Sequence, residues 1–127
     1  MCRVLHAVDG RGDRGPVTME HHIPSRIIQT GPSRDLPLLH RAVAANIKSL
    51  NPDFEYRFFD DDDVVRFVDT EFPEFRTMFD TFRFRIQKYD FFRYLSVCRF
   101  GGFYLDLDVL LGAGLSPFVE HDCIFSF

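Results

Sequence analysis

The stretch GGFYLDLDVLL, from Gly101 to Leu111, places two carboxylates in an otherwise apolar run that follows a pair of glycines. Its pattern predicts a β-strand. Because side chains alternate between the two faces of a strand, we expect Tyr104, Asp106, Asp108 and Leu110 on one face. Two residues of strand would separate the acids by about 6.6 Å. An ionised carboxylate is costly to bury without a partner, so a cation is expected there. Hard oxygen ligands suit Mn²⁺ or Mg²⁺, and the adjacent glycine-rich turn indicates phosphate chemistry.

Upstream of this stretch the chain alternates between short apolar strands and helices. Strands are expected over Arg26 to Thr30 and Phe54 to Asp60, with apolar residues at helical spacing between them, over Leu38 to Ile47. A longer helix is expected from about Arg85 to Phe100, ended by the glycine pair. This order predicts an α/β fold with a mostly parallel sheet, in which ligands bind beyond the carboxyl ends of the strands.

Three shorter features fill the remaining segments. Asp60 is expected to cap a helix that follows it directly, and Pro73 to begin a further short helix. The acidic run from Asp60 to Asp63 lacks the spacing and central glycine of an EF-hand loop. It is better explained as carboxylates that complement a helix N-terminus. The segment DCIFSF, from Asp122 to Phe127, resembles the start of another strand.

The composition is that of one modest globular domain. Residues 1–22 mix charges, glycines and histidines and are expected to be a disordered lead-in, so the folded part would be residues 23–127. The last residues are apolar and strand-like, and a sheet that ended there would expose an unpaired edge. We therefore expect a longer natural catalytic unit of which this is the N-terminal half. The net charge of −4 disfavours nucleic-acid binding. We find no signal peptide, no apolar run that could cross a membrane, and no CxxC spacing for zinc.

The helix from Arg85 to Phe100 carries a second group of candidate residues. Its apolar arc is predicted to contain Asp90, with Arg93 three residues on as the partner that a buried carboxylate needs. The residues of the predicted arc are Ile86, Phe91, Tyr94, Leu95, Val97 and Cys98. The pair has two interpretations: it binds sugar hydroxyls at a site entrance, or it is a structural ion pair. Lone histidines are more often structural than ligands, although His121 follows the two acids closely enough to remain a candidate near the metal.

Several segments together resemble one known family. These are IPSRIIQTG, NPDFEYRFFDDDD, IQKYDFFRYLSVCRFGGFYLDLDVLL and EHDCIFSF, which span residues 23–127. Their order is similar to that of the DXD-containing glycosyltransferases of family 32. The resemblance implies a GT-A fold, a Rossmann-like nucleotide-sugar-binding domain, of which this chain would be the N-terminal half. It also implies metal-dependent, retaining transfer of a hexose (mannose, galactose or glucose) from a nucleoside-diphosphate sugar to a glycan or glycolipid.

The resemblance also implies roles for individual residues. Asp106 and Asp108 would be the DXD acids, with Asp108 binding Mn²⁺ (or Mg²⁺) directly and Asp106 contacting ribose, sugar or metal-bound water. Asp90 and Arg93 would hold hydroxyls of the donor sugar. Ile28, Gln29 and Thr30 would border the nucleoside. Family members commonly have His-Gln-Thr-Trp at this strand end, whereas this chain has Ile-Gln-Thr-Gly.

Two other functions are compatible with parts of this sequence pattern. A catalytically inactive fragment could bind a nucleotide sugar or a partner without turnover. A haloacid-dehalogenase-type phosphatase also ends a strand in Asp-x-Asp, but its motif usually continues with Gly-Thr instead of Val-Leu. The resemblance further implies Golgi or membrane association for a eukaryotic protein and a cytoplasmic location for a bacterial one.

Overall fold

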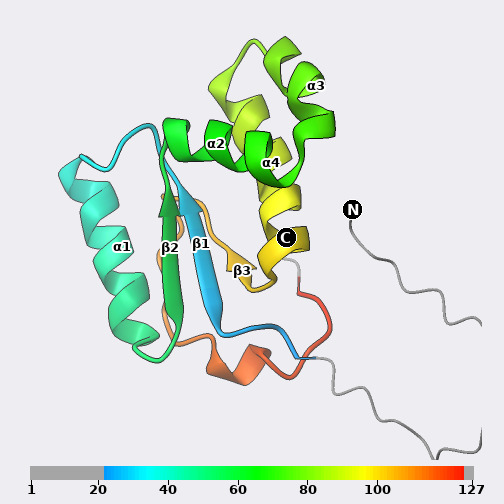
Figure 1. Cartoon of the computed structure of the whole chain (residues 1–127). Coiled ribbons are helices and arrows are strands. Elements are labelled where there is room, and N and C mark those ends of the chain that lie inside the picture. Colours follow the sequence, from blue (N-terminus) through cyan, green and yellow to red (C-terminus); the bar gives the residue numbers. More distant parts are fainter. Residues whose placement is uncertain (1–21, 125–127) are drawn as a thin grey trace, which may run out of the picture.

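The computed structural model describes residues 22–124, and its secondary structure alternates strands with helices (Figure 1). The elements are β1 (Arg26–Thr30), α1 (Leu38–Leu50), β2 (Glu55–Phe59), α2 (Asp61–Glu71), η1 (Pro73–Phe75), α3 (Arg76–Thr81), α4 (Arg85–Phe100), β3 (Phe103–Tyr104) and η2 (Ser116–Phe118). No helix within residues 22–124 is long and apolar enough to cross a membrane.

The three strands form one parallel sheet with the order β2-β1-β3. Strand β1 is central: Ile28 pairs with Arg57 of β2 and with Tyr104 of β3. Figure 1 shows the three strands side by side, with helices connecting them. The expected α/β class with a parallel sheet is therefore confirmed. In such a sheet the carboxyl ends of all strands lie at one edge, where ligands bind.

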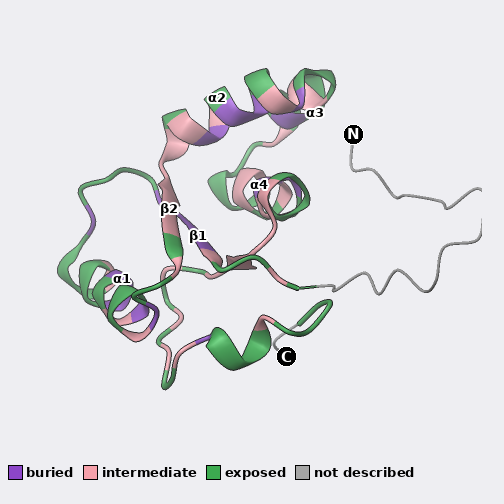
Figure 2. Ribbon diagram, turned by 60° about the horizontal axis from the view of Figure 1, so that its bottom comes forward, coloured by how far each residue is buried: buried purple, intermediate pink, exposed green. Residues whose placement is uncertain are grey.

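Two hydrophobic cores cover the two faces of this sheet, because neighbouring residues of β1 point to opposite sides. Ile28 packs with residues of α2, α3 and α4, including the fully buried Phe79 and Phe92. Ile27 packs with α1 and with Leu115 of the C-terminal segment. Figure 2 shows this arrangement, with α4 and α1 on opposite sides of the sheet.

Phenylalanine fills much of the first core. The Phe92 ring lies 4.9 Å from the Phe59 ring and 5.1 Å from the Phe67 ring, measured between centroids. Large rings bury much apolar area each and prefer such tilted or edge-on contacts. The 16 phenylalanines of the sequence thus include those that pack α2 and α4 onto the sheet.

Most of the predicted elements are present. Strand β1 and helix α4 have the predicted bounds, and β2 falls within the predicted range. The Asp60 side chain accepts from the backbone N–H of Asp63, which confirms the predicted cap and the structural explanation of the acidic run. Pro73 begins a single 3-10 turn before α3, not one continuous helix.

Three predictions about local structure are wrong. Strand β3 ends at Tyr104, so the acids do not lie on a strand. The buried face of α4 is formed by Phe92, Leu95 and Ser96, while Ile86, Tyr94 and Val97 of the predicted arc are exposed. Asp122–Ile124 form no strand, and residues 125–127 lie outside the described part of the chain, as does the proposed lead-in up to residue 21.

Candidate functional site

The acidic segment directly follows β3 at the carboxyl edge of the sheet. The N–H of Leu105 still donates to the Ile28 carbonyl, 3.0 Å away, but the chain then turns. The N–H of Val109 donates back to the Asp106 carbonyl at 3.2 Å. Asp106 and Asp108 therefore lie in a turn, and both are exposed. The predicted strand ends early because β3 has a sheet partner for only two residues, but the predicted alternation persists in exposure, with Asp106, Asp108 and Leu110 exposed.

The side chain of Gln29 fixes this turn to the central strand. Its Nε2 donates to the Asp106 carbonyl at 3.1 Å, and its Oε1 accepts from the Tyr56 hydroxyl at 2.8 Å. Gln29 is fully buried, where an unpaired amide would be costly. The three groups together set the backbone position of the first acid relative to β1 and β2.

A second link joins the end of β1 to β3. The hydroxyls of Thr30 and Tyr104 are 2.6 Å apart, within hydrogen-bond distance. Burial raises the pKa of Tyr104, and the hydrogen bond to Thr30 opposes that rise. The phenol therefore stays neutral at ordinary pH and can donate or accept a proton in a hydrogen bond. Thr30 and Ile28 are buried, so both support the edge of the sheet from within.

Arg93 of α4 connects the two groups of predicted acids. One of its terminal nitrogens lies 2.9 Å and 3.2 Å from the two carboxylate oxygens of Asp106, and 3.3 Å from a carboxylate oxygen of Asp90. Its guanidinium also lies over the Tyr104 ring, 4.8 Å from the centroid. The Nε–H of Arg93 is buried and has no hydrogen-bond partner within the described residues.

The carboxylates of Asp90, Asp106 and Asp108 differ in their ion pairs. The side chains of Asp90 and Asp106 are 53% and 49% exposed, so both face solvent while sharing Arg93. The predicted pairing of Asp90 with Arg93 is present, but the pair is not buried. Asp108 has no ion pair with another described residue.

Asp108 is accordingly the one of these three carboxylates that Arg93 does not neutralise. Over residues 22–124 no group of three or more His, Cys, Asp or Glu side chains could hold a metal, so His121 does not join the two acids. Protein ligands to Mn²⁺ or Mg²⁺ would come from the DXD acids, with oxygens of a diphosphate or water completing the shell. Such shared coordination is usual for Mg²⁺ at phosphate sites.

The predicted site residues thus fall into two sets. Asp90, Arg93 and Asp106 are brought into contact, whereas Asp108, two residues after Asp106, forms no ion pair with Arg93. Gln29 and Thr30 touch the acidic segment and β3 through their side chains. Tyr104 was predicted only to share a face with the acids, and no sequence pattern indicated that Tyr56 belongs to this network.

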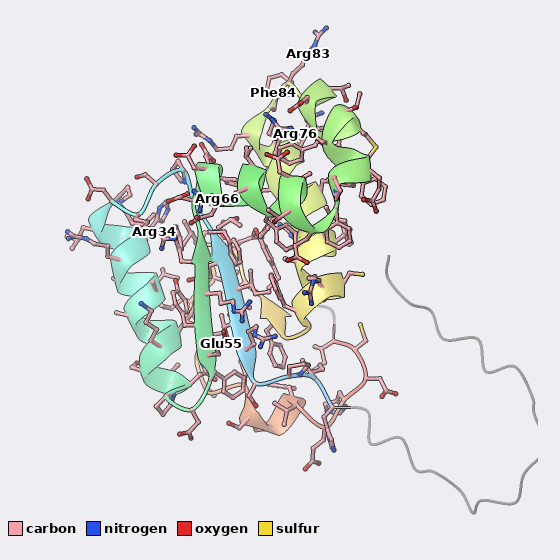
Figure 3. All side chains as sticks on the ribbon, viewed as in Figure 1. Arg34, Glu55, Arg66, Arg76, Arg83 and Phe84 are labelled. Atoms are coloured by element: carbon pink, nitrogen blue, oxygen red, sulfur yellow. The ribbon has the colours of Figure 1, made fainter. Side chains whose placement is uncertain are left out.

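The acidic run at the start of α2 lies at the same edge of the sheet. Arg34 pairs with Asp60 at 3.3 Å and with Asp63 at 2.5 Å. Figure 3 shows Arg34 at this edge, while Glu55 lies toward the opposite end of β2. The Asp61 carboxylate accepts from Arg85 at 2.9 Å and from the Tyr89 hydroxyl at 2.5 Å. These contacts join α2 to the β1–α1 connection and to α4.

Comparison with known proteins shows the family to which the chain is related. Residues 39–125 match the family model described as a glycosyltransferase sugar-binding region containing the DXD motif. No solved structure matches the chain. The parallel α/β sheet with the acids at its carboxyl edge agrees with part of a GT-A, Rossmann-like domain.

Curated relatives come from fungi and from a giant virus. An inositol phosphoceramide mannosyltransferase of Schizosaccharomyces pombe is 32% identical over 99 residues, which are 78% of this chain and 28% of the relative. A mannosyl phosphorylinositol ceramide synthase of Saccharomyces cerevisiae is 31% identical over 68% of this chain and 22% of its own length. An uncharacterized glycosyltransferase of Acanthamoeba polyphaga mimivirus is 32% identical over 72% and 37%, respectively.

This chain therefore spans between about a fifth and two fifths of the length of these relatives. The match to the family model covers more than half of the 127 residues and includes α4, both glycines and both acids. The chain belongs to the glycosyltransferases that carry a DXD-containing sugar-binding region.

Proposed function

We propose that this chain is the donor-binding part of a hexosyltransferase that uses a nucleoside-diphosphate sugar. The observation that carries the proposal is the contact of Arg93 with both Asp90 and Asp106 at the carboxyl edge of the sheet. This arrangement offers partly exposed carboxylates and a guanidinium, that is, hydrogen-bond acceptors and donors, at the place where α/β sheets bind ligands. Residues 23–127 would form the donor-binding part, and the remainder of a longer protein would complete the acceptor site.

Each candidate residue has a role in the proposal. Asp90 and Arg93 would hold hydroxyls of the donor sugar, since carboxylates accept and guanidinium N–H groups donate. Asp106, held by Arg93 and through its carbonyl by Gln29, would contact the ribose, the sugar or a metal-bound water. Asp108 would bind the metal.

The end of β1 would lie against the nucleoside. Ile28, Gln29 and Thr30 are buried, and the side chains of the last two already hold the acidic turn and β3. Their contribution would be to position the edge that borders the nucleoside, with the turn that follows Thr30 providing the contact surface. Gly31 has no side chain, so that turn lacks the aromatic ring that the family resemblance leads us to expect there.

Mn²⁺ or Mg²⁺ would be held by Asp108, with Asp106 nearby, and when bound would neutralise charge on the leaving diphosphate as a Lewis acid. Mannose is the donor sugar we favour, because curated fungal relatives are named mannosyltransferases of inositol phosphoceramide. By the same reasoning the acceptor would be a glycolipid. We infer retention of anomeric configuration from the family resemblance.

Calorimetric titration with GDP-mannose and UDP-galactose, with and without Mn²⁺, tests the donor and metal assignments. We expect saturable binding of one donor that requires Mn²⁺ and is lost in Asp108→Asn. Asp122→Asn is the matched control, since it removes an exposed carboxylate in the C-terminal segment. Donor binding that is independent of both Mn²⁺ and Asp108 would overturn the proposal.

Turnover separates an enzyme from a binding protein. Transfer of the sugar to a glycolipid acceptor, followed by NMR of the new anomeric proton, would report both activity and stereochemistry. Metal-dependent donor binding without transfer by the natural full-length protein would favour the non-catalytic alternative. An inverted anomeric centre would contradict the retaining mechanism.

A further inference from the structure

A second concave site lies beside the candidate donor site, between the start of α2, helix α3 and the start of α4. It encloses about 240 Å³. Because a water molecule takes about 30 Å³, this space has room for a phosphate group with several waters. Its apolar wall is Val64, Val65 and Phe79, and its polar wall comes largely from α4. None of the proposed donor-site residues lines it.

The polar wall carries an excess of positive charge. Arg83, Arg85 and Lys88 line the cavity, against one carboxylate, that of Asp61. Asp61 is already bound by Arg85 at 2.9 Å and by the Tyr89 hydroxyl at 2.5 Å. Among residues 22–124, neither Arg83 nor Lys88 forms an ion pair.

Other arginines of the same region are neutralised. Arg76 of α3 pairs with Asp69 at 2.5 Å and with Asp80 at 3.0 Å, and Arg34 pairs with two aspartates. Arg83 and Lys88 therefore carry charges that no described carboxylate neutralises, and the Lys88 ammonium lies over the Phe79 ring, 5.1 Å from its centroid. Figure 3 shows Arg83 at the connection between α3 and α4, at the outer rim of this part of the molecule.

Helix α4 contributes residues both to the cavity and to the candidate donor site. Tyr89 lines the cavity, and the next residue, Asp90, pairs with Arg93 on the donor side. Helix α4 therefore carries residues of both sites.

We propose that Arg83, Arg85 and Lys88 form a binding site for a phosphate group, either a monoester or a diester, of the molecule that accepts the sugar. Cations at the rim attract the anion, and the apolar wall strengthens that attraction by excluding water. The identification of the ligand as the acceptor rests on the proposed function; the binding of a phosphate group does not.

The test is calorimetric titration of the full chain with glycerol 3-phosphate, a monoester, and glycerophosphoglycerol, a soluble diester, without Mn²⁺ or nucleotide. We expect saturable binding of at least one ester. The double variant Arg83→Gln/Lys88→Gln should weaken it by about tenfold or more, because two charged hydrogen bonds are lost. Binding of the monoester alone would identify a terminal phosphate, and binding of the diester would identify a phosphodiester.

Arg41→Gln is the control for loss of a positive charge elsewhere, because Arg41 lines a separate surface groove, between α1 and β2. It should leave ester affinity within about twofold. Circular dichroism of each variant checks that the fold is kept, and wild-type affinity should fall as NaCl is raised. Absence of saturable binding, or an equal loss in Arg41→Gln, would overturn the phosphate site.

The outcome is separable from that of the proposed function. Ester binding together with absent donor binding would keep the site and refute the donor assignment. Mn²⁺-dependent donor binding together with absent ester binding would do the reverse. With both present, ester and GDP-mannose should bind at the same time, since the two sets of lining residues do not overlap.

Discussion

At the level of single residues, Arg93 organises the candidate site. It contacts Asp90 one turn earlier on its own helix, Asp106 beyond β3, and the face of Tyr104. An arginine can make all three contacts because its guanidinium is planar, carries five N–H groups and stacks on rings. Lysine offers a single point charge on a flexible stem.

Arg93→Lys should therefore weaken donor binding while leaving the fold intact. The pair is partly exposed, with side-chain exposures of 35% for Arg93 and 49% for Asp106, so the free energy of unfolding should change by less than about 1 kcal/mol. Donor affinity, measured by calorimetry with Mn²⁺, should fall by about tenfold or more because charged hydrogen bonds are lost.

The matched control is Arg99→Lys on the same helix. Arg99 pairs with Glu71 and lies over the Phe100 ring, so it makes the same kinds of contact away from the acidic turn. Its replacement should not alter donor affinity. Equal effects of the two substitutions would contradict a role for Arg93 in binding.

The sequence predicted some of these contacts and not others. Asp90 and Arg93 are three residues apart on a helix, a spacing that brings side chains together, so their pairing was foreseeable. The contact with Asp106 depends on how α4 and β3 pack across the glycine pair. The buried side of α4 was misjudged because aromatic residues lie on several sides of that helix, and tertiary packing decides which of them are covered.

At the level of elements, the connection from α4 to β3 depends on backbone conformations that favour glycine. Gly102 has φ +91°, and a Cβ there would lie 2.5 Å from the Arg26 carbonyl oxygen. Real side chains do not approach a backbone oxygen so closely. The two strands can come together at this point only because Gly102 has no side chain.

Gly102→Ala should destabilise the protein by more than about 1 kcal/mol, since alanine is both strained at positive φ and in steric conflict with β1. Urea denaturation followed by circular dichroism would measure this loss. Gly112→Ala is the control, because a Cβ at Gly112 meets no atom within 4 Å. Similar stability of both variants would show that the close packing of β3 on β1 is wrong.

The N-terminus of α2 gives a second prediction at this level. The Asp60 and Asp63 side chains each accept from the other's backbone N–H, so both form a reciprocal cap. Asp60→Ala should cost about 1 kcal/mol of unfolding free energy. Asp62→Ala, which removes an exposed acid of the same turn outside the cap, should cost less than about 0.5 kcal/mol. The difference between the two midpoints in urea checks the cap.

Elements with strong local signals were predictable, and the short strand was not. Strand β1 has apolar residues and a closing Gly-Pro, α4 ends at two glycines, and α2 begins at a capping aspartate. The length of β3 is fixed by its partner instead: β1 pairs with only Phe103 and Tyr104 before the acidic turn begins. An alternating pattern does not reveal where a neighbouring strand stops.

At the level of the whole molecule, tyrosine burial makes stability depend on alkaline pH. Burial raises the pKa of Tyr56 to about 12 from its ordinary value of 10.0, and burial also raises the pKa of Tyr104. The folded state therefore holds these protons where the unfolded state releases them. This contribution to stability is complete below pH 10 and is lost as the pH rises toward 12.

We expect the urea midpoint to fall between pH 10 and pH 12, and to fall less steeply in Tyr56→Phe. Slopes are compared because the substitution also removes the hydroxyl that donates to Gln29 and so lowers stability at neutral pH. Tyr94→Phe is the control, since Tyr94 is exposed on α4. A slope unchanged in Tyr56→Phe would mean that Tyr56 ionises equally in the folded and unfolded states.

The α/β class followed from the order of elements alone, because strands that alternate with helices favour parallel pairing. Which side of the sheet each helix covers was not predictable. It depends on the alternation of Ile27 and Ile28 across β1, which places α1 against one and the α2–α4 group against the other.

Because of that alternation, β1 is the element that contributes buried residues to both hydrophobic cores, which are otherwise separate. All five of its residues pair with β2, and Ile27 and Ile28 also pair with β3; the side chains of these two isoleucines anchor the two layers. Neither layer can come apart entirely without disturbing the other's anchor, so the layers should melt as one cooperative unit. The β1 amide hydrogens would then be among the last in the chain to exchange with deuterated water.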